Sequence, residues 1–141
     1  MILVYNQSHM NEVTFNELPD TPEVREMVRQ NAEKSISFTS VDNDDNVLFI
    51  GGVCHLWGSV YEVWVFTTPL FFKKLKTSLA DVHKLVAQMK QLKFARVQAD
   101  VRADLSNRLN FVRHFGFREE SVMEKYGPNG ETYIRWVYFG E

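Results

Sequence analysis

A basic cluster, formed by Lys73, Lys74 and Lys76, stands directly before a predicted helix. It is followed by the hydroxyl-bearing residues Thr77 and Ser78. The first turn of a helix presents unpaired backbone N–H groups and the positive end of the helix dipole, and both attract anions. The cluster therefore predicts a phosphate-binding site, with a solvated basic loop before a capped helix as the alternative interpretation.

The segment 60–68 is rich in β-branched and aromatic residues and predicts a strand that carries one carboxylate, Glu62. Alternate side chains of a strand share a face, so we expect Trp64 and Phe66 to lie beside this carboxylate. An apolar setting would suit a general base that takes a proton from an ammonium group, directly or through water. The alternative is a glutamate at the exposed start of the strand.

The remaining residues with reactive side chains give weaker candidates. Asp100 and Asp104 are alternative bases, but surface ion pairs with Arg102 and Arg108 are the expected state of both carboxylates. The four histidines are far apart in the sequence, and none has metal-ligand spacing with the single cysteine, Cys54. The sequence therefore predicts no metal site, and one cysteine excludes an internal disulfide.

These candidates lie on a predicted alternation of strands and helices. Strands are expected at 2–6, 36–41, 47–57, 60–68, 94–101, 118–125 and 132–139. Helices are expected at 8–18, from 22 to about 33, at 78–92 and at 105–115. Thr21 should cap the second helix with Pro22 in its first turn, and Ser78 should cap the third with Asp81 as its capping-box partner. Gly116 should end the fourth helix.

Turn signals connect these elements. The Asp/Asn-rich segment 42–46 predicts a hairpin turn, and residues 127–130 predict a second turn. Gly51 and Gly52 inside a strand indicate a bulge or a close backbone approach. A helix between the strands at 60–68 and 94–101 predicts a right-handed parallel crossover. The expected fold class is α+β, with a mixed, mostly antiparallel sheet and helices on both faces.

This order of elements, together with the segment Phe111-Val-Arg-His-Phe-Gly-Phe117, resembles the GNAT superfamily of N-acetyltransferases. In that family a similar Phe-Tyr-x-x-x-Gly-Phe segment ends the last helix and opens the next strand. The resemblance covers roughly residues 36–139 and implies a single GNAT-like domain over residues 1–141. The segment 121–133, with Glu62-Val-Trp64, looks more narrowly like phage-encoded GNAT-like proteins, some of them internal virion proteins of short-tailed phages.

The resemblance implies acetyl-CoA as co-substrate and Glu62 as the catalytic residue. The strand backbone would bond the pantetheine arm, and the following helix would receive the pyrophosphate. The implied cofactor-binding residues are Val65, Phe66, Thr67, Lys73, Lys74, Lys76, Thr77, Ser78, Leu79 and Asn107. Two positions depart from the family pattern: Lys76 stands where the phosphate loop has glycine, and Val112 stands where many members have a proton-donating tyrosine.

The implied function is acetyl transfer from acetyl-CoA to a primary amine by direct attack. The amine acceptor would be a small molecule or a protein. The alternative is a catalytically inactive GNAT-fold protein with a structural or interaction role, such as a phage internal virion protein. The expected location is cytoplasmic, or the host cytoplasm or virion for a phage-encoded chain.

Composition and charge limit the remaining partners. No apolar run approaches the length of a membrane helix, so no membrane partner is expected. Residues 1–60 hold nine acidic and three basic side chains, and residues 61–141 hold nine acidic and thirteen basic ones. The acidic half would suit a cationic acceptor and the basic half an anionic ligand. The bases are interleaved with core residues, which argues against nucleic acid, and the aromatic-rich final strand is a candidate for pairing across a homodimer.

Overall fold

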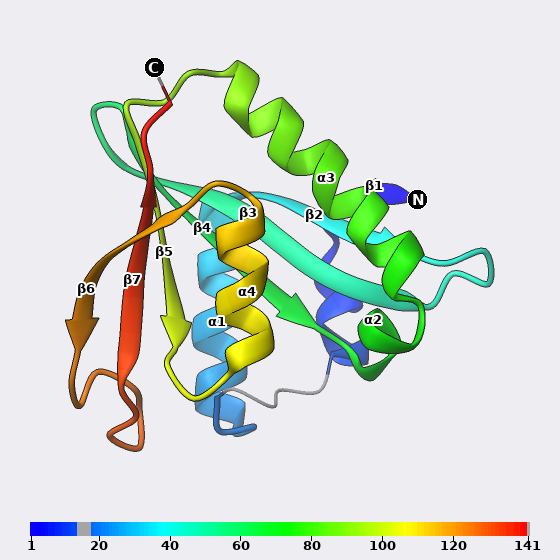
Figure 1. Ribbon diagram of the computed structural model, residues 1–141. Helices are drawn as coiled ribbons and strands as arrows, with labels where there is room; N and C mark the ends of the chain where they lie inside the picture. The colour runs from blue at the N-terminus through cyan, green and yellow to red at the C-terminus, as the bar shows by residue number, and fades with distance from the viewer. Residues whose placement is uncertain (14–17, 141) are drawn as a thin grey trace. The chain divides into compact units, whose positions relative to one another are not determined.

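The computed structural model describes residues 1–13 and 18–140 (Figure 1). In chain order the elements are β1 (Ile2–Val4), η1 (Gln7–Glu12), α1 (Pro22–Lys34), β2 (Ile36–Val41), β3 (Val47–Trp57), β4 (Val60–Thr67), α2 (Pro69–Lys73), α3 (Leu75–Gln91), β5 (Arg96–Arg102), α4 (Ser106–His114), β6 (Arg118–Met123) and β7 (Tyr133–Tyr138). No helix within the described ranges is both long and apolar enough to cross a membrane.

The strands form one mixed sheet in the order β1-β2-β3-β4-β5-β7-β6. The pairs β1–β2, β2–β3, β5–β7 and β6–β7 are antiparallel, whereas β4 and β5 are parallel. The parallel ladder pairs Val60 with Arg96, Tyr61 with Val97, and Glu62 with Gln98. The predicted fold class and the predicted parallel crossover are therefore confirmed.

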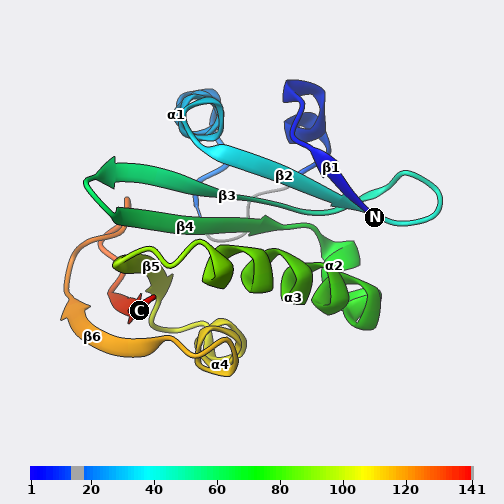
Figure 2. The same ribbon diagram turned by 90° about the horizontal axis from the view of Figure 1, so that it is seen from above.

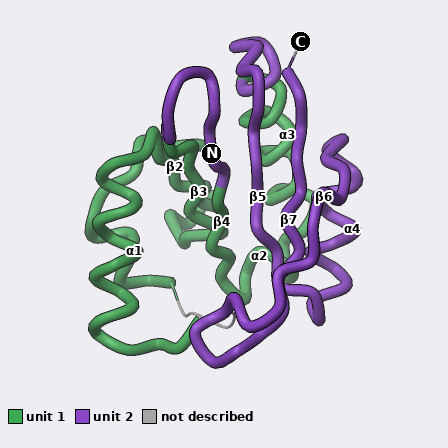
Figure 3. The backbone as a smooth tube through the Cα atoms, turned by 90° about the vertical axis from the view of Figure 1, so that its left-hand side faces the viewer, with its two compact units in different colours: residues 1–54, 64–88 green, residues 55–63, 89–141 purple. Residues whose placement is uncertain are grey.

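The chain divides into two compact units, shown in different colours in Figure 3. Unit 1 consists of residues 1–54 and 64–88, and unit 2 consists of residues 55–63 and 89–141. Both units are discontinuous in sequence because the chain passes from one to the other within β3, β4 and α3. The single-domain organisation stays a prediction.

In unit 1, α1 covers one face of the strands and α3 covers the other (Figure 2). α1 begins as predicted, with Pro22 in its first turn and the Thr21 hydroxyl accepting a hydrogen bond from the Val24 N–H group at 3.2 Å. Its Val28 and Ala32 side chains are buried. These two side chains belong to a hydrophobic core cluster in unit 1. Its buried residues are Met10, Val13, Val28, Ala32, Val41, Val47 and Ile50.

Two predictions for the N-terminal part need correction. Where a helix is expected over 8–18, residues Gln7–Glu12 form a short 3₁₀ helix, η1, and residues 14–17 lie outside the described residues. The helical spacing of Val24, Met27 and Val28 predicts that all three lie on the apolar face of α1, but the Met27 side chain is exposed. Successive helical residues are about 100° apart, so a helix that turns Val28 toward the core turns Met27 away from it.

The glycine pair in β3 marks a close approach of two strands. A Cβ atom on Gly52 would lie 2.7 Å from Trp64 Cζ2, and one on Gly51 would lie 3.2 Å from the Trp64 carbonyl oxygen. The Trp64 ring is held in place by its Nε1, which donates a hydrogen bond to Ser35 Oγ at 3.1 Å. Close approach is therefore the correct interpretation at Gly52, and the register shift of this ladder lies in β2, between Ser40 and Val41.

Unit 2 contains β5, β7, β6 and α4, and its buried apolar residues include Val97, Ala99, Phe115, Phe117, Tyr133, Trp136 and Val137. Gly116 follows α4 with φ +89°, which confirms the predicted glycine stop. β7 pairs with β5 along one edge and with β6 along the other. The prediction that this final strand pairs across a homodimer is therefore wrong, because both of its edges are already bonded.

Candidate active site

Glu62 lies on β4, in the part of that strand that belongs to unit 2, and its side chain is partly buried. Its partner in the parallel ladder is Gln98 of β5, whose Nε2 donates a hydrogen bond to Glu62 Oε2 at 3.3 Å. Trp64 and Phe66, the expected apolar neighbours, pack against the core of unit 1. Within unit 2 the Glu62 carboxylate therefore has one polar neighbour, Gln98, and the apolar setting stays a prediction.

A second carboxylate, Asp100 on β5, accepts three hydrogen bonds. Arg135 of β7 donates from Nε to Oδ1 at 2.8 Å and from Nη2 to Oδ2 at 3.0 Å. The Tyr126 hydroxyl donates to Oδ2 at 3.0 Å. The partner of Asp100 is therefore Arg135, and neither Arg102 nor Arg108 as expected.

These contacts set the protonation states of the cluster. The hydrogen bond with Asp100 raises the pKa of Arg135, so its guanidinium stays charged. Burial and then the Asp100 charge raise the pKa of the Tyr126 hydroxyl. Tyr126 therefore keeps its proton at neutral pH and donates a hydrogen bond to Asp100. The nearby Glu62 carboxylate is a smaller cause that also raises the pKa of Tyr126 and of Arg135.

Two further arginines, both on β5, are also paired with carboxylates. Arg102 forms a bidentate pair with Asp104, at 2.8 Å from Nε to Oδ1 and 2.9 Å from Nη2 to Oδ2, as the sequence predicted. Arg96 forms a bidentate pair with Glu120 of β6. Sequence reasoning missed Gln98, Arg135 and the Arg96–Glu120 pair as neighbours of the candidate base. The available signal was the parallel register, which places residues 60–62 beside residues 96–98.

The predicted phosphate-binding segment of unit 1 is mostly helical. The short helix α2 ends at Lys73, Lys74 forms the junction, and α3 already begins at Leu75. Ser78, the predicted cap, is fully buried inside α3, and its hydroxyl lies within hydrogen-bonding distance of the carbonyl oxygens of Phe71 (3.1 Å) and Lys74 (3.0 Å). The predicted capping role of Ser78 is therefore wrong, and its hydroxyl is occupied by the backbone.

The predicted capping partner, Asp81, also has another role. Its carboxylate is buried and accepts hydrogen bonds from Ser40 Oγ at 2.7 Å and from the Met1 ammonium at 3.0 Å. Ser40 lies on β2, and Met1 directly precedes β1. Asp81 therefore joins α3 to the sheet of its own unit.

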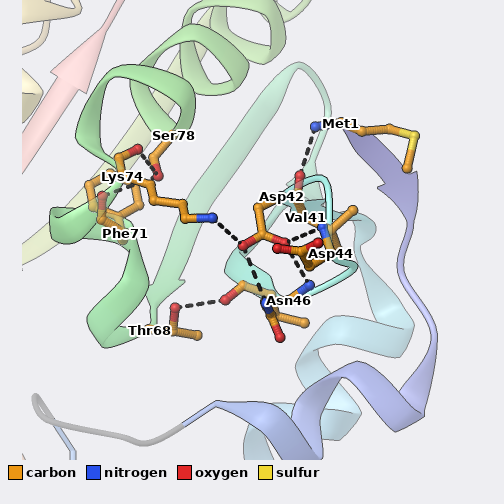
Figure 4. A network of polar contacts seen from close by, with 10 residues as sticks. Met1, Val41, Asp42, Asp44, Asn46, Thr68, Phe71, Lys74 and Ser78 are labelled. Carbon is orange, nitrogen blue, oxygen red and sulfur yellow. Dashed lines mark hydrogen bonds and ion pairs between the residues drawn. The ribbon is translucent and has the colours of Figure 1, made fainter.

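Lys74 is tied to the β2–β3 turn (Figure 4). Its Nζ donates to Asp42 Oδ2 at 2.7 Å, and the Asp42 side chain is only 2% exposed. Asp42 Oδ1 also accepts from the Asp44 and Asn46 N–H groups, both at 2.9 Å, which builds the predicted hairpin turn. The hydrogen bond from Lys74 and these N–H groups hold the pKa of Asp42 well below its usual range. Lys74 thus has a structural partner.

The other predicted cofactor residues have different exposures. Lys73, Lys76 and Thr77 are exposed beside the first turn of α3, whereas Leu79 is partly buried. On β4, Val65 is exposed and Phe66 and Thr67 are partly buried. Asn107 is exposed in the first turn of α4, in unit 2. The predicted site residues are therefore divided, with Glu62 and Asn107 in unit 2 and the others in unit 1.

The sequence matches no protein-family profile and no curated protein. Among solved structures, the ribosomal-protein-S18-alanine N-acetyltransferase from Escherichia coli is 14% identical with a TM-score of 0.78, covering 99% of this chain and 92% of that one. The chain has the GNAT fold. A GNAT-family acetyltransferase from Bacillus anthracis is 17% identical with a TM-score of 0.71, covering 99% and 93%. An N-acetyltransferase from Staphylococcus aureus Mu50 is 12% identical with a TM-score of 0.76, covering 100% and 98%.

These likenesses extend over almost the whole chain in both directions. They confirm the fold that the sequence resemblance implied, because elements from both units are included in the match. The three structures named here come from bacteria and give no support to a phage origin. The relation to internal virion proteins therefore stays a prediction.

Proposed function

We propose that the chain is an acetyl-CoA-dependent N-acetyltransferase that acts on a primary amine. The observation that supports it best is the likeness to N-acetyltransferases over 99% of this chain. The second support is Glu62, a partly buried carboxylate that receives a hydrogen bond from an uncharged amide. A carboxylate that is not neutralised by a bonded cation keeps its capacity to accept a proton.

In the proposed reaction Glu62 removes a proton from the acceptor ammonium, directly or through one water molecule. The freed nitrogen lone pair attacks the acetyl carbonyl carbon and forms the new C–N bond. The C–S bond then breaks, and the nitrogen releases its second proton to water as the amide forms. The departing thiolate takes a proton from water, because Val112 has none to give. The pairing of Asp100 with Arg135 and Tyr126 makes Asp100 the poorer candidate for the base.

The residues of unit 1 fit an anionic co-substrate. Lys73 and Lys76 place two exposed cations beside the first turn of α3, and Thr77 adds a hydroxyl. Backbone N–H groups of a first helical turn and cations together favour a diphosphate. In this proposal Lys74 and Ser78 act differently from the family expectation, because they hold the α2–α3 junction in place.

The remaining cofactor residues complete the proposal. Within unit 1, the backbone of Val65, Phe66 and Thr67 would bond the pantetheine arm as an added strand would, and Leu79 would contact the co-substrate from α3. A contact from Asn107 stays a prediction. Acetyl-CoA supplies the activated acyl group and a thiolate leaving group. The cytoplasmic location and a homodimer through another surface stay predictions.

Calorimetric titration with acetyl-CoA tests the phosphate part of the proposal. The double variant Lys73→Ala/Lys76→Ala should weaken binding about tenfold or more, because each lost charge–phosphate contact is worth on the order of 1 kcal/mol. Its melting temperature without ligand should not change. Lys34→Ala, which removes an exposed lysine at the end of α1, is the matched control and should bind normally. Equal affinity of the double variant and the wild type would contradict this site.

A second function is favoured by two specific residues. Lys76 and Val112 stand where the family has a phosphate-loop glycine and a proton-donating tyrosine, so a GNAT-fold protein without catalysis, serving a structural or interaction role, is the competing proposal. Such a protein would fail to transfer acetyl groups to any amine, whether or not it binds acetyl-CoA. Multiple turnovers that Glu62→Gln abolishes would exclude it.

A further inference from the structure

The side chain of Gln98 bridges two charged groups inside unit 2. It is only 7% exposed and lies on β5 between Arg96 and the candidate base. Arg96 Nε donates to Gln98 Oε1 at 3.2 Å, and Gln98 Nε2 donates to Glu62 Oε2 at 3.3 Å. Arg96 is itself fixed by its bidentate pair with Glu120. A continuous chain of hydrogen bonds therefore leads from β6 through β5 to Glu62.

This chain allows only one orientation of the Gln98 amide. The Arg96 guanidinium can donate hydrogen bonds but cannot accept them, so the amide oxygen has to face Arg96. The amide NH₂ group then has to face Glu62. In the flipped orientation the amide NH₂ group would face the Arg96 guanidinium, so that two donors would meet. The amide oxygen would face the Glu62 carboxylate, so that two acceptors would meet. Gln98 is thus a fixed donor, and it holds the carboxylate oxygen that it contacts in one place.

The other charged groups near Glu62 are committed elsewhere. The guanidinium of Arg135, on β7, is bonded to both oxygens of Asp100, on β5. The hydroxyl of Tyr126, in the turn before β7, also donates to Asp100. The charge of Glu62 influences Arg135 and Tyr126 only through space. Asp100 thus holds Arg135 and Tyr126, and in the described part of the chain the hydrogen-bond donor to Glu62 is a neutral amide.

We propose that Gln98 is the positioning residue of the general base, holding Oε2 of Glu62 so that Oε1 is the atom that receives the proton. This inference rests on the proposed function, because it assigns a role beside the proposed base. It adds a residue that the sequence analysis did not single out. A neutral donor is suited to this task, because it fixes the carboxylate without cancelling the charge that makes it a base.

A kinetic double-mutant cycle tests this role. Gln98→Met keeps a similar volume but removes both hydrogen bonds, and Gln98→Glu keeps the shape but faces Glu62 with an acceptor. Each change should lower kcat for acetyl transfer about tenfold, with little change in KM for acetyl-CoA, because misplacing a base weakens the chemical step. In a Glu62→Gln background the Gln98→Met change should have no further effect on kcat. Circular dichroism melts establish that each variant is folded.

Nuclear magnetic resonance supplies a readout that does not need activity. The Gln98 side-chain NH₂ signals are assigned as the pair that disappears in Gln98→Met. We expect these signals to move during acid titration of the wild type, and the part of that movement due to Glu62 to vanish in Glu62→Gln. Identical titrations in both proteins would overturn the contact itself.

The outcomes separate this inference from the function on which it rests. A wild-type chain that transfers no acetyl group overturns the proposed function, and the catalytic role of Gln98 falls with it. An active wild type in which Gln98→Met lowers kcat equally in both backgrounds overturns the positioning role alone. A loss of kcat that appears only when Glu62 is present, together with the Glu62-dependent titration, supports the inference.

Discussion

Replacing Asp100 with asparagine should destabilise the protein far more than the same change at Asp104. Both carboxylates form bidentate pairs with an arginine at nearly the same distances, Asp100 with Arg135 and Asp104 with Arg102. The exposures differ: the Asp100 side chain is 12% exposed and the Asp104 side chain 62%. The two variants therefore form a matched comparison in which burial is the main difference.

The expected magnitude follows from that burial. Removing one partner of a fully buried pair costs about 3–5 kcal/mol, whereas an exposed pair is worth about 0.2–1 kcal/mol. The Asp100–Arg135 pair is mostly but not fully buried, with Arg135 27% exposed. We therefore expect Asp100→Asn to lower the free energy of unfolding by about 2 kcal/mol. The loss of the Tyr126 hydrogen bond to a charged acceptor contributes to this cost.

Urea unfolding followed by circular dichroism at pH 7 measures this difference. A loss of this size should lower the urea midpoint by about 1 M and the melting temperature by roughly 7 °C. Asp104→Asn should produce a much smaller change in both quantities. Equal losses in the two variants would refute the reasoning, because they would show that solvent screening does not separate the two pairs.

Two further outcomes follow from contacts in unit 1. Because the pKa of Asp42 is lowered in the folded chain, its pair with Lys74 contributes stability above the ordinary aspartate pKa and loses it as the pH falls. Lys74→Met should therefore flatten the decline of the urea midpoint below about pH 4, and an unchanged acid curve would contradict the pairing. Gly52→Ala should lower the melting temperature more than Gly51→Ala, because the new Cβ would lie 2.7 Å from the Trp64 ring. We expect a cost of about 1–3 kcal/mol, and equal melting temperatures would show that the ring can move aside.

Local signals predicted much of the fold. The N-terminus of α1 could be placed because a threonine cap and a proline in the first turn act within one turn of the chain. The β2–β3 turn could be placed because Asp42 bonds the backbone of Asp44 and Asn46, its near neighbours. Strand alternation and the intervening helix gave the parallel pair of β4 and β5.

The α2–α3 junction could not be read in the same way. Ser78 and Asp81 have the types and spacing of a capping box, but both side chains are buried inside α3. Their partners are Phe71 for the serine, and Ser40 and the N-terminal ammonium for the aspartate. These two hydrogen bonds of Asp81 join residues that are 41 and 80 positions apart, and a single sequence does not show such pairs.

The candidate site was predictable only in part for the same reason. The sequence singled out Glu62 from its strand and from a family resemblance. The nature of its surroundings depends on Gln98, which is 36 positions away. The commitment of Lys74 to Asp42, 32 positions away, likewise removes one of the three lysines from the predicted phosphate site.

The most direct test of the proposed function is acetyl transfer by wild-type and Glu62→Gln proteins. Purified protein is mixed with acetyl-CoA and a panel of primary amines, and N-acetylated product is measured by mass spectrometry alongside calorimetric binding of acetyl-CoA. We expect multiple turnovers with at least one amine, a loss of about 10²- to 10⁴-fold in kcat for Glu62→Gln, and equal affinity of the two proteins for acetyl-CoA. Absence of product with every amine, or an unchanged kcat in Glu62→Gln, would contradict an acetyltransferase that uses Glu62 as its base.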